Sequence, residues 1–137
     1  MEFNPYLLFN GDCEEALKFY EQTFGGKIEA LMRFEGSPAA QHAPAGWGNK
    51  VLHATLNLDG NVVMASDAPQ DYHRPQGISV AIGLDDKDRA ERIFNALAQG
   101  GTTTMPFQKT FFASGFGMCV DRFGIPWMVN CDQKENE

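Results

Sequence analysis

Apolar residues recur with helical spacing in two segments, residues 12–24 and 86–99. Each segment opens with an aspartate that can cap a helix and is followed by a pair of glycines that can end one. The pattern predicts two amphipathic helices whose first residues are 74 positions apart. The apolar faces are Ala16, Leu17, Tyr20 and Phe24 in the first helix and Ala90, Ile93, Phe94 and Leu97 in the second.

Strand-like segments surround both helices. They are residues 5–9, 28–34, 51–58 and 61–66 around the first helix and residues 78–84, 102–105, 113–121 and 126–130 around the second. Each half therefore has the order strand, helix, strand, strand, strand, which predicts an α+β fold of two βαβββ modules. We expect a single domain over residues 1–137, with module one at about 4–68 and module two at about 77–131.

The four residues Ile28, Ala30, Met32 and Phe34 alternate along the second strand, and we expect them to share one face. Two segments break the symmetry between the halves. Residues 35–50 contain several prolines and glycines and predict a long loop, and residues 67–76 predict the link between the modules. Loops of this length often carry function.

Most aspartates have a local structural explanation. Capping and turn chemistry account for Asp12, Asp59, Asp86 and Asp121, and Glu15 completes a capping box with Asp12. Asp67 and Asp71 lie in the predicted link, and we expect both to be solvated, as acids generally are.

Composition narrows the class of protein. With 43% hydrophobic and 21% charged residues the chain is typical of a folded domain. The formal net charge of -7, with no basic cluster, argues against nucleic acid or an anionic membrane as partner. No apolar run approaches the roughly 20 residues of a membrane span, and the N-terminus does not read as a signal peptide. Three cysteines without CxxC spacing fit a cytoplasmic protein.

His53 is the candidate for chemistry among the three histidines. It lies in the middle of a predicted strand and shares a face with Thr55 and Asn57, opposite the apolar residues. If that face lines a cavity, His53 can donate a proton or hydrogen bond or ligate a metal. The alternative is a hydrogen-bonded structural histidine. His42 and His73 lie in the predicted loops, where we expect them to be solvent-exposed.

Aromatic residues suggest a binding pocket. Phe107, Phe111 and Phe112 lie in one short segment, Trp47 lies in the long loop, and Trp127 lies in the last strand. Small-molecule pockets are mostly apolar with a few polar anchors. Packing in the core is the alternative role for these side chains. The sequence contains no HExxH, EF-hand, P-loop, dinucleotide or Gly-x-Ser-x-Gly motif.

Short motifs along nearly the whole chain resemble one protein family. They are Pro5-Tyr6-Leu7, Asn10-Gly11-Asp12-Cys13, Ala16-Leu17 with Phe19-Tyr20, His53-Ala54, Met64-Ala65-Ser66-Asp67-Ala68, Ser114-Gly115-Phe116-Gly117 and the run from Asp121 to Asn130. The chain thereby resembles the PhnB-like branch of the vicinal oxygen chelate superfamily, which includes glyoxalase I, bleomycin-resistance proteins and extradiol dioxygenases. The resemblance implies that the eight strands form an incomplete barrel around a pocket, with the helices outside, and that the protein is a homodimer.

The resemblance also shows where metal-dependent members hold their ion. The corresponding positions fall near Pro5, Ala65 or Ser66, Ser79 and Met128, and none of them is histidine or glutamate. We therefore expect no metal and no cofactor at the usual site, although a divalent ion at another site stays open. A methyltransferase name is attached to some family members, but this sequence has no Gly-rich strand-to-helix turn for a nucleotide-like cofactor.

Three hypotheses for function follow. The first is a protein that binds a small molecule in the concave face near His53. The second is a metal-dependent lyase, isomerase or dioxygenase of the same superfamily, with His53 as its catalytic residue. The third is a dimer whose pocket has lost its function. The candidate pocket-lining residues are Trp47, His53, Thr55, Ser66, Phe112 and Trp127.

Overall fold

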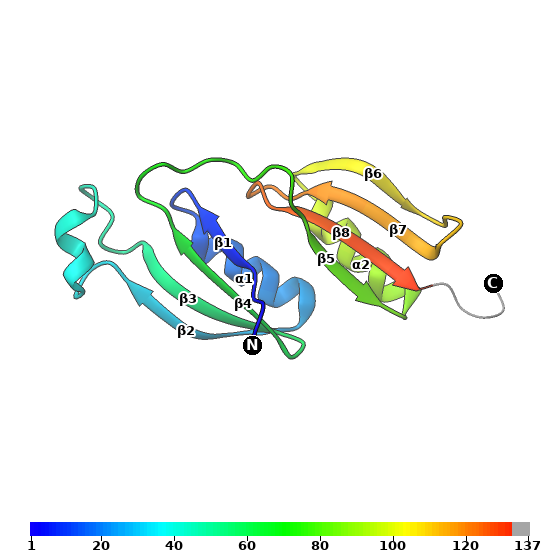
Figure 1. Cartoon of the computed structure of the whole chain (residues 1–137), viewed down its shortest axis with the longest axis horizontal. Helices are drawn as coiled ribbons and strands as arrows, with labels where there is room; N and C mark the ends of the chain where they lie inside the picture. Colours follow the sequence, from blue (N-terminus) through cyan, green and yellow to red (C-terminus); the bar gives the residue numbers. More distant parts are fainter. Residues whose placement is uncertain (133–137) are drawn as a thin grey trace. The chain divides into compact units, whose positions relative to one another are not determined.

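The computed structural model describes residues 1–132, which form two compact units that divide between His73 and Arg74 (Figure 1). The first unit contains β1 (Tyr6–Phe9), α1 (Cys13–Phe24), β2 (Lys27–Arg33), the short 3-10 helix η1 (Pro38–His42), β3 (Val51–Leu58) and β4 (Asn61–Asp67). The second contains β5 (Val80–Leu84), α2 (Lys87–Ala98), β6 (Thr102–Gln108), β7 (Ala113–Val120) and β8 (Pro126–Asp132). The predicted order of elements is confirmed in both halves, and η1 adds a helical turn inside the predicted long loop.

The two units share one topology. The strand order is β1-β4-β3-β2 in the first sheet and β5-β8-β7-β6 in the second. In each sheet the first strand pairs in parallel with the last, and the other neighbours are antiparallel. The predicted α+β class with two βαβββ modules is therefore confirmed. Each sheet is open, with β1 and β2 as the edges of one and β5 and β6 as the edges of the other.

Each helix covers one face of its own sheet, as Figure 1 shows. The predicted apolar faces of both helices are buried, so the prediction of helices packed against one side of the strands is confirmed within each unit. The alternate strand residues complete the two cores, because successive side chains of a strand point to opposite faces. The buried strand residues include Leu7, Phe9, Ala54, Leu56 and Ala65 in the first unit and Cys119, Trp127, Val129 and Cys131 in the second.

The starts of the two helices differ. The side chain of Asp86 caps α2 as predicted, with Oδ1 accepting a hydrogen bond from the Arg89 N–H at 3.1 Å. The predicted capping box at α1 is wrong, because the Asp12 side chain makes no cap bond. Its backbone, at φ -115° and ψ 22°, lies outside the extended region that a capping residue normally adopts.

The glycine pairs after the helices have two separate roles. Gly25 ends α1 in the left-handed conformation, at φ 74°. A Cβ on Gly26 would overlap the carbonyl oxygen of Asn57, and a Cβ on Gly101 would overlap that of Val120. The second glycine of each pair thus lets the chain pass close to the neighbouring strand, at equivalent places in both modules.

The alternation predicted for the second strand is wrong. A register shift between Ile28 and Ala30 inserts an extra residue, so Leu31 replaces Ala30 on the side of α1. Ala30 and Met32 consequently lie on the opposite face. Bulges are common in edge strands, and β2 is an edge of its sheet. Within residues 1–132 we find no helix with the length and apolar character needed to cross a membrane.

Candidate functional site

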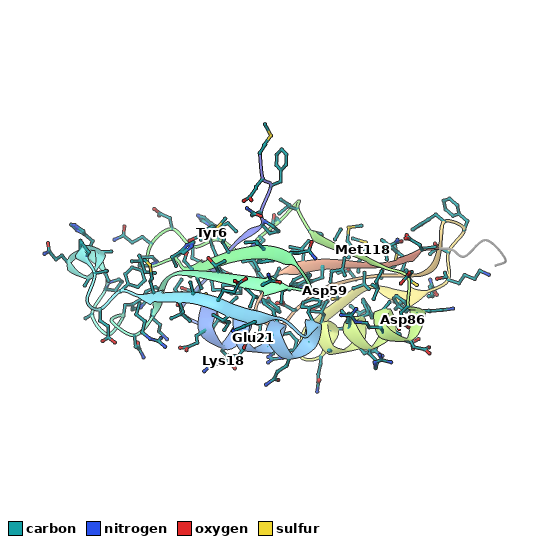
Figure 2. All side chains as sticks on the ribbon, turned by 90° about the horizontal axis from the view of Figure 1, so that it is seen from below. Tyr6, Lys18, Glu21, Asp59, Asp86 and Met118 are labelled. Carbon is teal, nitrogen blue, oxygen red and sulfur yellow. The ribbon has the colours of Figure 1, made fainter. Side chains whose placement is uncertain are left out.

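The candidate site lies on the face of the first sheet that α1 does not cover, which we call the open face. Strand register places its side chains in two neighbouring rows, since paired residues point to the same side. The first row is Tyr6, Met64, Thr55 and Ala30, and the second is Leu8, Ser66, His53 and Met32. Figure 2 shows Tyr6 on the opposite side of the ribbon from Lys18 and Glu21 of α1.

His53 lies in the second row, next to Met32 of β2, and is half-buried. The hydroxyl oxygen of Tyr6 lies 3.1 Å from Nδ1 of His53, and the hydroxyl oxygen of Thr55 lies 3.5 Å from Nε2. The Tyr6 and His53 ring centroids are 5.7 Å apart. When the tyrosine hydroxyl donates to Nδ1, the ring proton is on Nε2, which faces Thr55. The predicted strand phase of His53, Thr55 and Asn57 is confirmed, and so are the hydrogen bonds of the structural alternative.

Exposed, largely apolar side chains lie in the same two rows as His53. The exposed fractions are 43% for Tyr6, 47% for Leu8 and 53% for Met32. The two rows contain no aspartate, glutamate, lysine or arginine. Exposed apolar side chains grouped with a few polar ones are typical of a binding site. Chemically, the imidazole can exchange a hydrogen bond or a proton with a bound molecule.

Ser66 lies in the row of His53, so the structure brings together three predicted site residues: His53, Thr55 and Ser66. Trp47 belongs to the same unit but lies elsewhere. Its ring packs edge-on against Phe34, with centroids 6.1 Å apart, and approaches Gly11 just before α1. The loop therefore places Trp47 near the N-terminal end of α1, outside the two rows.

The other two predicted residues belong to the second unit. Phe112 is partly exposed after β6, with its ring 5.1 Å from those of Phe111 and Phe116. Trp127 is only 2% exposed, and its indole N–H donates to Oδ2 of Asp121 at 2.8 Å. The alternation of β8 points Trp127 into the core beside α2, so the alternative of core packing holds for this residue.

Tyr6 is the residue of the site that the sequence did not single out. It lies 47 positions from His53 and reaches it only through the pairing of β1 with β4 and of β4 with β3. Tyr6 is part of the Pro5-Tyr6-Leu7 motif, but no spacing in the sequence connects it with His53.

Asp67 contradicts its predicted role as a solvated acid. It is 3% exposed, and its carboxylate accepts three backbone hydrogen bonds of 2.9 Å. Oδ1 binds the N–H groups of Gly11 and Cys13, and Oδ2 binds that of Val51. Asp67 therefore supplies the cap that Asp12 does not, and it ties the start of α1 to the start of β3. Burial, together with the Asp67 and Asp12 carboxylates, raises the pKa of the Cys13 thiol, so it stays protonated.

The donors beside His53 do not match a common metal site. They are a phenol and two aliphatic hydroxyls, whereas zinc takes nitrogen, sulfur and carboxylate oxygen, and calcium takes six or more oxygens, carboxylates among them. Among residues 1–132 no group of three or more His, Cys, Asp or Glu side chains is placed to hold an ion. We therefore derive no chemical step through a metal.

The paired βαβββ units define a glyoxalase/bleomycin resistance-like fold. A glyoxylase/bleomycin resistance protein/dioxygenase domain from Frankia sp. EAN1pec shares this fold at 12% identity, with a TM-score of 0.65 over 97% of this chain and 98% of that chain. The family model described as 3-demethylubiquinone-9 3-methyltransferase matches residues 1–130, and the chain belongs to this PhnB-like family.

Three relatives show how close the similarity is. Protein YjdN of Escherichia coli (strain K12) is 32% identical over 139 residues, covering 95% of each chain. The crystal structure of protein PA1353 from Pseudomonas aeruginosa is 46% identical, with a TM-score of 0.88 over 98% of this chain and 99% of that one. A Bacillus cereus PhnB protein, also described as a 3-demethylubiquinone-9 3-methyltransferase, is 25% identical with a TM-score of 0.82, over 96% and 99% of the two chains.

Proposed function

We propose that this protein binds a small molecule on the open face of its first sheet, with His53 as the polar anchor. The observation that carries the proposal is the hydrogen-bonded but half-exposed imidazole among exposed apolar side chains. A sheet face that is exposed to water ordinarily carries charged and polar residues. The two rows of the open face contain no charged residue, so contact with water alone does not explain their composition.

An enzyme built on the same site is the second candidate. The pairing of Tyr6 with His53 favours it, because a hydroxyl on Nδ1 orients the ring and leaves Nε2 to exchange a proton with a bound molecule. The two candidates share every residue of the site and differ only in whether the bound molecule changes.

A fragment screen by ¹H–¹⁵N NMR tests the proposal. We expect saturable shifts in β1, β3 and β4 for some neutral aromatic fragments. His53→Ala should weaken the binding of these fragments about tenfold, because it removes the polar anchor. His42→Ala is the matched control, since His42 is exposed in η1, and it should change nothing. Shifts that never involve the open face, or that His53→Ala leaves intact, would contradict the proposal. Incubating a binding fragment and analysing it by mass spectrometry separates binder from enzyme.

We also propose that the protein is a two-fold symmetric homodimer. The open edges β1, β2, β5 and β6 support this proposal, because exposed strand edges are normally covered. Light scattering at micromolar concentration should give about twice the chain mass of 15.2 kDa. A mass equal to that of one chain would contradict it.

A further inference from the structure

The charges near the open face restrict which ligand can bind there. Resting on the function proposed above, we infer that the ligand is an uncharged, largely apolar molecule that carries one hydroxyl or carbonyl oxygen, and that this oxygen binds at Nε2 of His53. The apolar body of such a molecule would lie over the apolar side chains of the two rows, and its single polar atom would lie at the imidazole.

The nearby charged groups have other partners. The Arg33 guanidinium makes two 3.0 Å bonds to the Glu14 carboxylate and a further bond to the Asn49 carbonyl. Lys50 donates to the Gly11 carbonyl oxygen at 2.8 Å. Asp67 uses both carboxylate oxygens on backbone N–H groups. Each of these charged groups therefore already has a partner within the protein.

Two charged residues, Lys27 and Glu29, line one hollow with Asn57 at the turn end of β3. Lys27 pairs in register with Asn57, which lies four residues along the strand from His53. Asn57 and His53 are therefore about 13 Å apart along the strand. A charged group bound at His53 would therefore lose its hydration without gaining an opposite charge, which is unfavourable.

The hydrogen bonds of His53 identify the atom that is free to change partners. The Tyr6 contact to Nδ1, at 3.1 Å, is the shorter of the two. The Thr55 contact to Nε2, at 3.5 Å, is at the limit of a hydrogen bond, so little is lost when a ligand replaces it. With the tyrosine hydroxyl donating to Nδ1, Nε2–H is a donor, and a hydroxyl or carbonyl oxygen accepts from it.

The apolar body of the ligand has adaptable neighbours. Met32 lies next to His53 and Met64 next to Thr55 in the strand register, and Leu8 lies on the same face at 47% exposure. Methionine side chains are flexible and polarizable, and their sulfur makes favourable contacts with aromatic rings. A flat aromatic or alicyclic body fits this lining better than a compact polar one.

Four probes of one shape test the inference: 4-ethylphenol, ethylbenzene, 4-ethylbenzoate and 4-ethylbenzylammonium. We expect 4-ethylphenol to bind most tightly in NMR titrations of the unmodified protein, with both charged probes about tenfold weaker. Ethylbenzene should bind about fivefold more weakly than the phenol, because it lacks the hydrogen bond. In His53→Ala this preference for the phenol should vanish, while His42→Ala should retain it.

The outcomes separate this inference from the function on which it rests. If 4-ethylbenzoate or 4-ethylbenzylammonium binds most tightly with shifts centred on His53, the ligand class is wrong and the binding function stands. The same holds if none of the four binds and the fragments of the screen that shift His53 are charged. If no compound shifts His53, both fail. The order of the probes is measured on the unmodified protein, so the inference stays testable even if His53→Ala does not fold.

Discussion

Replacing Asp67 by alanine should lower the free energy of unfolding by about 4 kcal/mol, and replacing it by asparagine by about 2 kcal/mol. The alanine variant leaves the N–H groups of Gly11, Cys13 and Val51 without their acceptor, and the bonds to Cys13 and Val51 are buried. An asparagine can keep its oxygen on Gly11 and Cys13, but its amide group then faces the Val51 N–H. Two donors in contact repel each other, so the amide restores only part of the loss.

Urea denaturation followed by far-UV circular dichroism measures both Asp67 variants. Glu15→Gln is the matched control for Asp67→Asn, because it also removes one negative charge but from the exposed surface of α1. The control should change stability by less than about 0.5 kcal/mol. An Asp67→Ala protein as stable as the control would show that the three backbone bonds contribute little.

The same carboxylate links stability to the candidate site. Asp67 directly follows Ser66, and its partner Val51 lies two residues before His53 in β3. An Asp67→Asn protein that remains folded should therefore bind open-face fragments more weakly, because the ends of the two strands that position His53 and Ser66 are no longer held together.

Replacing Asp121 by alanine should cost about 3 kcal/mol, the second large effect. Asp121 is 1% exposed and organises the turn between β7 and β8. Its Oδ1 accepts from the N–H groups of Phe123 at 2.9 Å and Ile125 at 3.0 Å, and its Oδ2 accepts from the indole of Trp127. If Asp121 were only a polar residue on the surface of the turn, its replacement by alanine would lower the free energy of unfolding much less.

A double-mutant cycle isolates the bond between Asp121 and Trp127. Trp127→Phe keeps an aromatic ring in the core but removes the indole N–H, so we expect a coupling energy of about 2 kcal/mol with Asp121→Ala. Asp85→Ala, at an exposed position before α2, is the control and should have little effect. Additive effects of the two substitutions would mean that the indole bond is not important for stability.

Local patterns were sufficient to predict the elements of this fold. Apolar spacing located both helices, because burial on one side imposes a period on the sequence. Short apolar runs between turn residues located the eight strands among residues 1–132. Where the pattern depended on long-range pairing it failed. The bulge after Ile28 places Ala30 and Met32 on the open face, and the residues of β2 contain no pattern that predicts the bulge.

The two buried aspartates show the same division. Asp121 was correctly placed in a turn, since the glycine and the aspartate that define the turn lie close together in the sequence. Its bond to Trp127, and the burial of that tryptophan, depend on how β8 packs against α2. The sequence around Asp67 predicts a surface acid, because its partners at Gly11, Cys13 and Val51 lie 16 to 56 residues away.

The sequence by itself determined the duplicated βαβββ plan and the face of β3 on which His53, Thr55 and Asn57 lie, because both follow from periods within single elements. Only the tertiary structure decided that Tyr6 reaches His53, that Ser66 joins the same row, and that Trp127 is in the core. Those positions depend on strand register and packing between segments far apart in the chain, and a short local pattern carries no information about either.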